Sequence, residues 1–239
     1  MADVLTILSN FVFLVPMAQA IKKHRWTRAV IYASIILFSS MYHACNSFEG
    51  ACVFHANFHR QLDFFFAQFV IPATALYIII FPKEIQFLER ILLILFAIAI
   101  VLVQVTVGEV FAAQLVITAI AFGCMVVYWS VYALWAWANE EEHYFPHYDW
   151  ECFAWGLGLT GLSASLFATE LQNHNLYWAV HSCWHSLAAL GQYYLLCIRP
   201  AAPRYANMDR MIKTRAVSKW AKREMRIVHH TPHGREIKF

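Results

Sequence analysis

The sequence predicts an all-α polytopic membrane protein with seven transmembrane helices, an extracellular N-terminus and a cytoplasmic C-terminus. The first observation is composition: 60% of the 239 residues are hydrophobic and only 14% are charged, against about a quarter charged in a typical soluble domain. The second is that the apolar residues fall in long blocks, each near or above the ~20 residues that cross the hydrocarbon of a bilayer. The third is that the basic residues lie almost entirely on one side of these blocks.

Seven apolar blocks define the predicted spans. The first begins at Val4 without a basic n-region or a small-residue cleavage site, so it is interpreted as a retained span and not as a signal peptide. Six spans result if the chain does not turn at Gly108 and Glu109, and every later segment then reverses. The predicted spans are Val4–Ile21, Thr27–Cys45, Leu62–Phe81, Phe87–Val107, Val110–Trp137, Cys152–Leu171 and Tyr177–Ile198.

The distribution of lysine and arginine sets the predicted orientation. With seven spans, one side of the membrane carries Arg60 alone and the other side carries the rest of the 18 basic residues. The positive-inside rule therefore places the N-terminus outside the cell. Residues 1–200 are predicted to form the transmembrane domain and residues 201–239 a basic cytoplasmic tail, whose segment 210–226 either lies on the anionic inner leaflet or is disordered. No soluble domain is left over, and no nucleic-acid partner is expected.

Small residues in the sixth span predict close helix packing. The segment GLGLTG, residues 156–161, matches the dinucleotide-binding fingerprint, but that fingerprint requires a preceding strand and a helix start, whereas this segment lies inside an apolar span. The residues expected to let a neighbouring helix approach closely are Ala154, Gly158, Gly161 and Ser165.

Polar side chains are costly inside a bilayer, yet three predicted spans carry them near the outer surface. Ser39 and His43 are four residues apart in FSSMYHACN, as are His181 and His185 in AVHSCWHSLAAL, so each pair shares one helix face. Asp63 opens the third span in RQLDFFF. In the seven-span topology all five residues fall in one shallow layer near the outer ends of the second, third and seventh spans.

Three imidazoles and a carboxylate are a ligand set that suits zinc. Three histidines with a water molecule make a catalytic pattern, in which Asp63 binds the metal directly or holds its water. The alternative is that the histidines are interfacial or hydrogen-bonded packing residues, which is the commoner role of a single histidine at a span end. His55 and His59 share the four-residue spacing but are expected in an outer loop without an anchored partner.

The motifs FSSMYHACN, LDFF and HSCWH resemble the Ser, His-x-x-Cys, Asp and His-x-x-x-His pattern of the CREST superfamily of seven-span membrane proteins. That superfamily contains alkaline ceramidases, progestin/adipoQ receptors and the transmembrane protein 8 family, and YHAC and HSCWH are most similar to the last. The resemblance covers residues 4–200 and implies seven spans, an outside N-terminus and a zinc ion. Its implied ligands are His43, His181 and His185, with Ser39 and Asp63 in or next to the ligand shell.

The resemblance implies two functions, and the sequence leaves both open. One branch of the transmembrane protein 8 family carries a large extracellular domain and acts as a phospholipase A2 on GPI anchors. This chain has almost nothing before its first span and is similar to the short branch, which drives myoblast fusion. The first expectation is a protein of the plasma membrane, or also of the Golgi, that promotes cell–cell fusion with outer-leaflet lipids, a partner fusogen or a second copy of itself as partners. The second is a zinc-dependent lipid hydrolase, for acyl esters or ceramide amides, in which Ser39 and Asp63 are catalytic.

Other features bear on these expectations. A seven-span receptor or transporter, with the polar residues as ligand contacts, is a third function class, supported only by span number. Vertebrate members of the short branch lack the motif serine and carry a lipidated, cysteine-rich C-terminus, whereas Ser39 is present here and no cysteine follows Cys197. Lipid anchoring of the tail is therefore not expected.

Members of the family show a cysteine pair like Cys45 and Cys52, which fall in an outer loop where disulfides are permitted. A disulfide is predicted, with two free thiols as the alternative.

Overall fold

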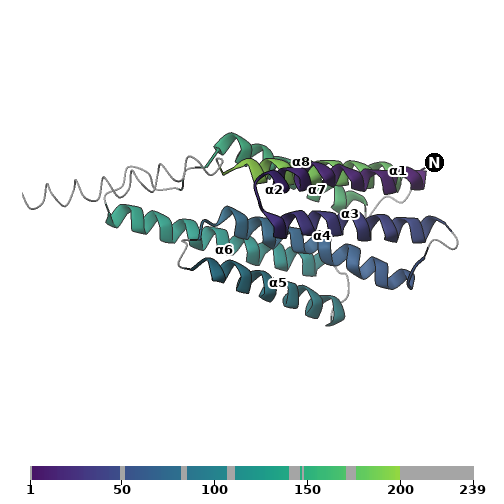
Figure 1. The fold of residues 1–239 in the computed structure, drawn as a ribbon, viewed down its shortest axis with the longest axis horizontal. Helices are drawn as coiled ribbons and strands as arrows, with labels where there is room; N and C mark the ends of the chain where they lie inside the picture. Colours follow the sequence, from purple (N-terminus) through teal and green to yellow (C-terminus); the bar gives the residue numbers. More distant parts are fainter. Residues whose placement is uncertain are drawn as a thin grey trace, which may run out of the picture. The chain divides into compact units, whose positions relative to one another are not determined.

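The computed structural model describes residues 2–48, 52–81, 85–106, 111–139, 146, 148–170 and 176–199 (Figure 1). Within these ranges 90% of the residues are helical and no strand is present, as the all-α prediction requires. The chain divides into two units, Met1–Arg199 and Pro200–Phe239. The predicted basic tail belongs to the second unit and lies outside the described residues, as does the turn predicted at Gly108 and Glu109.

Each predicted span overlaps helix in the described residues, although the third was predicted to reach Phe81 and its helix ends at Ile78. The first span is built from α1 (Ala2–Ser9), the 3₁₀ helix η1 (Asn10–Phe13) and α2 (Leu14–Lys22), which follow one another without a break. The tighter turn of η1 precedes Pro16, which has no N–H to donate to the carbonyl four residues earlier. The other helices are α3 (Trp26–Ser47), α4 (Ala56–Ile78), α5 (Gln86–Thr106), α6 (Phe111–Ala138), α7 (Trp150–Glu170) and α8 (Tyr177–Cys197).

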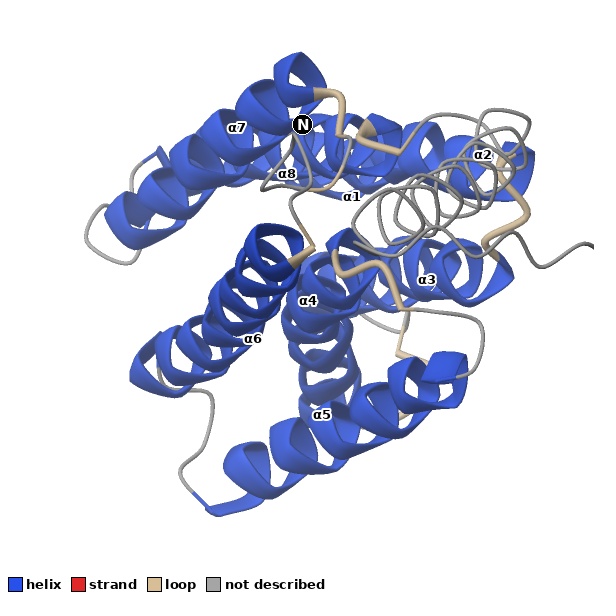
Figure 2. Cartoon of the chain, turned by 90° about the vertical axis from the view of Figure 1, so that its left-hand side faces the viewer, coloured by secondary structure: helices blue, strands red, loops and turns tan. Residues whose placement is uncertain are grey.

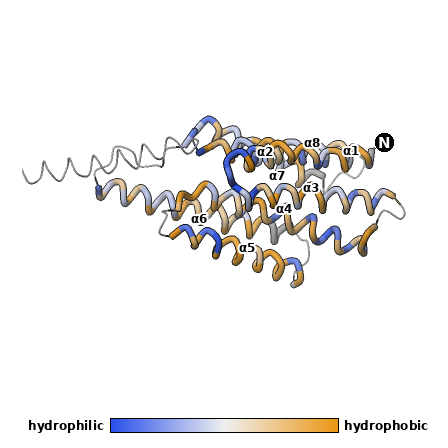
Figure 3. Tube along the Cα trace, viewed as in Figure 1, coloured by the Kyte–Doolittle hydropathy of each residue, from blue (hydrophilic) through white to orange (hydrophobic). Residues whose placement is uncertain are grey.

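Among the described residues, five segments are long and apolar enough to cross a membrane, which indicates a membrane protein. They are Val4–Lys22, Trp26–Ser47, Ala56–Ile78, Gln86–Thr106 and Leu115–Ala138. Large apolar side chains on α5 and α6 point outward, and Val105 and Trp137 are 77% and 69% exposed. Most of α5 beyond its first turns is coloured hydrophobic, whereas α6 is hydrophobic in its first half and paler toward its end (Figure 3). An exposed apolar surface of this extent is expected to be covered by lipid or by another protein.

Helix α4 lies in the middle of the described bundle (Figure 2). It packs against α3, α5, α6 and α8, while the first span packs against α3 and α8, and α7 packs along α8. The side chains of Tyr32, Leu76 and Leu196 are almost fully buried on α3, α4 and α8. Tyr32 and Thr74 both donate to Oε1 of Gln192 and so link these same three helices by hydrogen bonds. Interhelical hydrogen bonds of this kind contribute about 0.6 kcal/mol each in membrane proteins.

Close packing of α7 on α8 depends on two glycines that differ from the predicted small residues. A Cβ atom at Gly156 would lie 2.6 Å from Cγ of Leu195, and one at Gly191 would lie 2.6 Å from Oγ1 of Thr160. In contrast, a Cβ at Gly158 or at Gly161 would meet no atom within 4 Å, and the other two predicted residues are exposed. The prediction for Ala154, Gly158, Gly161 and Ser165 was wrong because the helix presents the opposite face to α8.

The predicted disulfide is confirmed. Cys45 and Cys52 are bonded, with their Cα atoms 4.5 Å apart. The bond joins the last turn of α3 to the segment that leads into α4, so it fixes the end of α3 two residues beyond His43. The alternative of two free thiols is excluded for this pair.

Candidate metal centre

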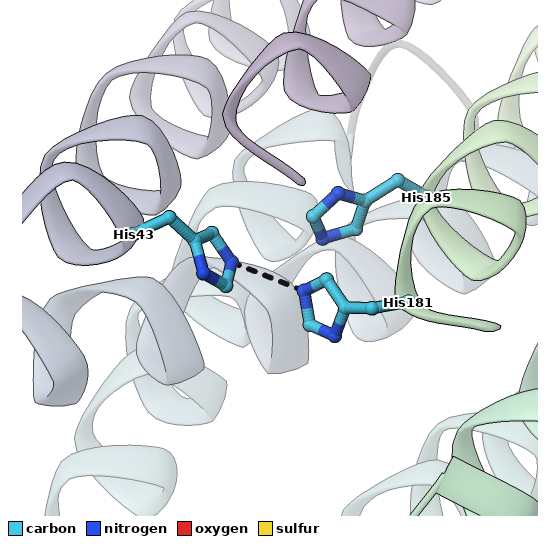
Figure 4. Close-up of side chains that lie close together, drawn as sticks. All are labelled: His43, His181 and His185. Carbon is cyan, nitrogen blue, oxygen red and sulfur yellow. Dashed lines mark hydrogen bonds between the residues drawn. The ribbon is translucent and has the colours of Figure 1, made fainter. Parts of the chain in front are cut away.

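Three buried histidines form one cluster, shown in Figure 4. His43 comes from α3, and His181 and His185 come from successive turns of α8. Their side chains are at most 6% exposed. One ring nitrogen from each residue lies within 4.8 Å of the other two, and Nε2 of His43 is 3.0 Å from Nε2 of His181. The four-residue spacing on α8 and the antiparallel course of α3 therefore bring the three predicted imidazoles together.

The cluster is compact enough to hold one metal ion. Zinc–nitrogen bonds of about 2.0–2.1 Å in tetrahedral geometry place the ligand nitrogens about 3.3 Å apart. The observed 3.0 Å between two of the nitrogens and the 4.8 Å limit for the group enclose this value. The three nitrogens are therefore close enough for one ion to reach all of them after small shifts of the rings.

Ser9 orients His185 and was not predicted from the sequence. Its Oγ lies 2.8 Å from Nδ1 of His185 and 2.7 Å from the carbonyl oxygen of Thr6. A serine hydroxyl has one hydrogen, and it donates that hydrogen to the Thr6 carbonyl. Ser9 therefore accepts a hydrogen bond from Nδ1–H of His185, which leaves the Nε2 lone pair for a metal. The available signal was the spacing of Thr6, Ser9 and Asn10, three buried polar residues on one side of a largely apolar first span.

Aromatic rings surround the histidines and restrict their rotation. Tyr177 stacks on the ring of His181 at a centroid distance of 4.9 Å. Trp184 contacts the rings of both His181 and His185, at 4.9 and 4.7 Å. Phe13 meets His185 edge to face at 6.2 Å. These contacts hold the imidazoles in place and limit the access of water to the cluster, as the surroundings of a metal site commonly do.

Ser39 lies one helical turn before His43 and is 1% exposed. Its Oγ is buried without a hydrogen-bond partner in the described part of the chain. Leaving a buried hydroxyl unpaired costs about 1–3 kcal/mol, so a bound water or a substrate oxygen would be stabilised there. Asp63 is half-buried on α4 and is not a member of the group of three mutually close histidines. The predicted roles of Ser39 and Asp63 at a metal stay predictions.

His55 and His59 form structural hydrogen bonds at the start of α4, whereas a loop position without an anchored partner was expected. His55 is the N-cap of α4, and its Nδ1 accepts a hydrogen bond from the backbone N–H of Asn57. His59 lies on α4 and is 1% exposed, and its Nε2 accepts from the backbone N–H of Phe54. Both residues are therefore anchored, because α4 begins at Ala56 and not at Leu62 as predicted.

A family comparison covers most of the chain. The model of the family described as "Protein of unknown function (DUF3522)" matches residues 1–186. The chain belongs to the DUF3522 family. The matched residues include all three histidines of the cluster and also Ser9. A comparison with curated proteins found no match. The match to the DUF3522 family therefore assigns the chain to a family but does not indicate an activity.

Proposed function

We propose that this member of the DUF3522 family binds one zinc ion through His43, His181 and His185, near the outer surface of a seven-span plasma-membrane protein. Three neutral imidazoles at these distances are a frequent zinc ligand set. The support comes from their mutual approach within 4.8 Å, their burial, and the hydrogen bond that directs His185. In the described part of the chain three ligands are present, and a fourth position open to water or substrate is typical of catalytic zinc.

The proposed topology includes α7 and α8 as the sixth and seventh spans. Each has 21 residues, enough to cross the hydrocarbon. Tryptophans mark the ends of helices that this topology assigns to the cytoplasmic surface: Trp26 opens α3, Trp137 lies near the end of α6 and Trp150 opens α7. All three are at least 47% exposed, and exposed tryptophan is enriched at membrane–water interfaces.

The function proposed first is promotion of cell–cell fusion, as in the myomaker branch of the transmembrane protein 8 family. The motif resemblance of FSSMYHACN and HSCWH supports it. The observation that carries it is the position of the histidine cluster, because the proposed topology puts this end of the bundle on the outer leaflet, where two cells meet. Zinc would then clamp α3 to α8 and present this end of the bundle to outer-leaflet lipids, a partner fusogen or a second copy of the chain.

The second candidate is a zinc-dependent lipid hydrolase, either phospholipase A2-like or ceramidase-like. The set of three ligands and the unpaired hydroxyl of Ser39, both found among the described residues, favour it. A zinc ion bound there would supply an acidified water and polarise the carbonyl of an ester or amide. In this reading Ser39 donates a hydrogen bond to the water or to the developing oxyanion, and Asp63 orients the water or accepts its proton.

A cell-mixing experiment separates the two candidates. The chain is expressed on two differently dyed cell populations, with and without a partner fusogen, and mixed cells are counted beside the fatty acid released from outer-leaflet lipids. The fusion proposal expects mixed cells from the wild type and none from His185→Ala. Fatty-acid or sphingoid-base release that a chelator abolishes, without cell mixing under any condition, would replace fusion by hydrolysis.

A further inference from the structure

Four cationic side chains gather at the end of the bundle opposite the histidine cluster. The guanidinium carbons of Arg25, Arg28 and Arg199 lie 5.5, 4.6 and 4.5 Å from the centroid of the Tyr77 ring. Lys23 joins them, because its Nζ donates two hydrogen bonds of 2.9 Å to carbonyls at the C-terminal end of α8. All three guanidinium groups lie over the Tyr77 ring. The distance between any two guanidinium carbons is therefore at most twice 5.5 Å. At about one Debye length or less, their charges repel one another.

The fold balances part of this charge. Arg199 donates to two carbonyls at the end of α4, and Lys23 donates to the end of α8. Arg28 donates to the carbonyl of Ala73, which lies farther back in α4. Each helix C-terminus is equivalent to about half a negative charge. Arg28 also forms an ion pair of 2.8 Å with Glu89. Four cations against one carboxylate and two helix ends leave a surplus of about two positive charges among these groups.

Donors remain for an anion at this cluster. Arg25 is half-buried and contacts the Tyr77 ring, but its guanidinium makes no hydrogen bond in the described part of the chain. Arg28 is 5% exposed, and its Nε is buried without a hydrogen-bond partner among the described residues. Guanidinium groups donate in pairs to phosphate oxygens, so a phosphate beside the two arginines would satisfy both.

The surface next to the cluster is apolar and aromatic. Trp26 and Val30 on α3 are 61% and 63% exposed, Ile21 on α2 is 41% exposed, and Phe87 on α5 is 55% exposed. In Figure 3 the connection between α2 and α3 is strongly hydrophilic and follows directly on the mostly hydrophobic α2. Cations bordered by exposed apolar side chains match a molecule that carries both a phosphate and acyl chains, and not a free anion.

We propose that Arg25, Arg28 and Lys23 bind the phosphate headgroup of an anionic phospholipid of the cytoplasmic leaflet, with its acyl chains along the apolar faces of α2 and α3. Basic clusters at the cytoplasmic ends of transmembrane helices bind such headgroups. The site lies at the other end of the bundle from the histidines and requires no metal. It therefore adds a lipid partner that the proposed function does not include.

The test uses the full chain in phosphatidylcholine nanodiscs and fluorescent phosphatidylinositol bisphosphate as the probe. Arg25→Gln is expected to weaken binding about fivefold, the effect of removing one cation near an anionic headgroup. Arg25→Lys keeps the charge and is expected to retain most of the affinity. The control is Arg90→Gln, because Arg90 is exposed on the first turns of α5 and is not one of the three arginines at the Tyr77 ring; its binding should match the wild type. A thermal melt of each variant confirms that it folds.

Three results would overturn the proposal. Unchanged binding by Arg25→Gln would show that the cluster is not the site. An equal loss in Arg25→Gln and Arg90→Gln would show general attraction to positive charge. Competition by soluble inositol trisphosphate at the same concentration as the lipid would show a site for a free phosphate and remove the role of the acyl chains.

Discussion

Replacing Ser9 with alanine removes the hydroxyl that orients His185 and tests whether the histidines form a metal centre. In the native chain Nδ1–H of His185 donates to Ser9 Oγ over 2.8 Å, and His185 is 3% exposed. Without the hydroxyl, a buried N–H loses its partner, at a cost of about 1–3 kcal/mol. Loss of a hydrogen bond behind a ligating histidine lowers metal affinity about 10–100-fold, which corresponds to about 1.4–2.7 kcal/mol.

The assay for Ser9→Ala is competition for zinc between the purified protein and a chromophoric chelator. The matched control is Ser182→Ala, because Ser182 is half-buried on α8 next to His181 and its Oγ bonds only the carbonyl of Trp178 in its own helix. The control should keep the wild-type affinity, while Ser9→Ala should lose at least tenfold. Equal zinc affinity in Ser9→Ala and the wild type would refute the assignment of the His185 tautomer and the reasoning built on it.

Three further predictions concern the packing, the disulfide and the chemistry. Gly156→Ala should destabilise the protein by about 1–3 kcal/mol, because its Cβ would overlap a side chain of α8. Gly158→Ala should be neutral in the same thermal melt, and equal melting temperatures of the two variants would contradict the α7–α8 packing. Cys45 and Cys52 should react with a thiol reagent only after reduction, and breaking their eight-residue loop by mutation should cost about 2–3 kcal/mol; labelling of both without reductant would exclude the bond. Ser39→Ala should keep zinc, and it should abolish lipid hydrolysis if the site is catalytic, whereas unchanged cell fusion by this variant would favour a structural zinc.

The sequence predicted the helices and the three histidines because both are local patterns. Apolar blocks of about 20 residues gave the positions of the helical segments, and four-residue spacing put His181 and His185 on one face of α8. Their approach to His43 followed from the order of the spans, which determines which helix ends lie at the same depth. The start of α4 was misplaced by several residues, because polar residues such as His59 and Arg60 continue an amphipathic helix beyond its apolar part.

Contacts between particular faces of helices could not be predicted. The first span had no motif, and the spacing of Thr6, Ser9 and Asn10 could indicate a face turned away from lipid but not that Ser9 contacts His185. The choice of Gly156 and not Gly158 as the close contact depends on the rotation of α7 about its axis, and a helix that is apolar all round carries no strong signal for that rotation. The basic residues near Tyr77 were used only to orient the chain, because their convergence requires the ends of α2, α4 and α8 to meet.

The zinc content of the purified protein, measured beside its thermal stability, is the most direct test of the metal centre. We predict about one zinc per chain in the wild type, with the metal lost and the melting temperature lowered in His181→Ala and in His185→Ala, because metal binding stabilises the folded state. A chelator should lower the melting temperature of the wild type and leave that of the two variants unchanged. Wild-type protein that contains no metal and melts at the same temperature with and without chelator would contradict the assignment of these histidines as a metal centre.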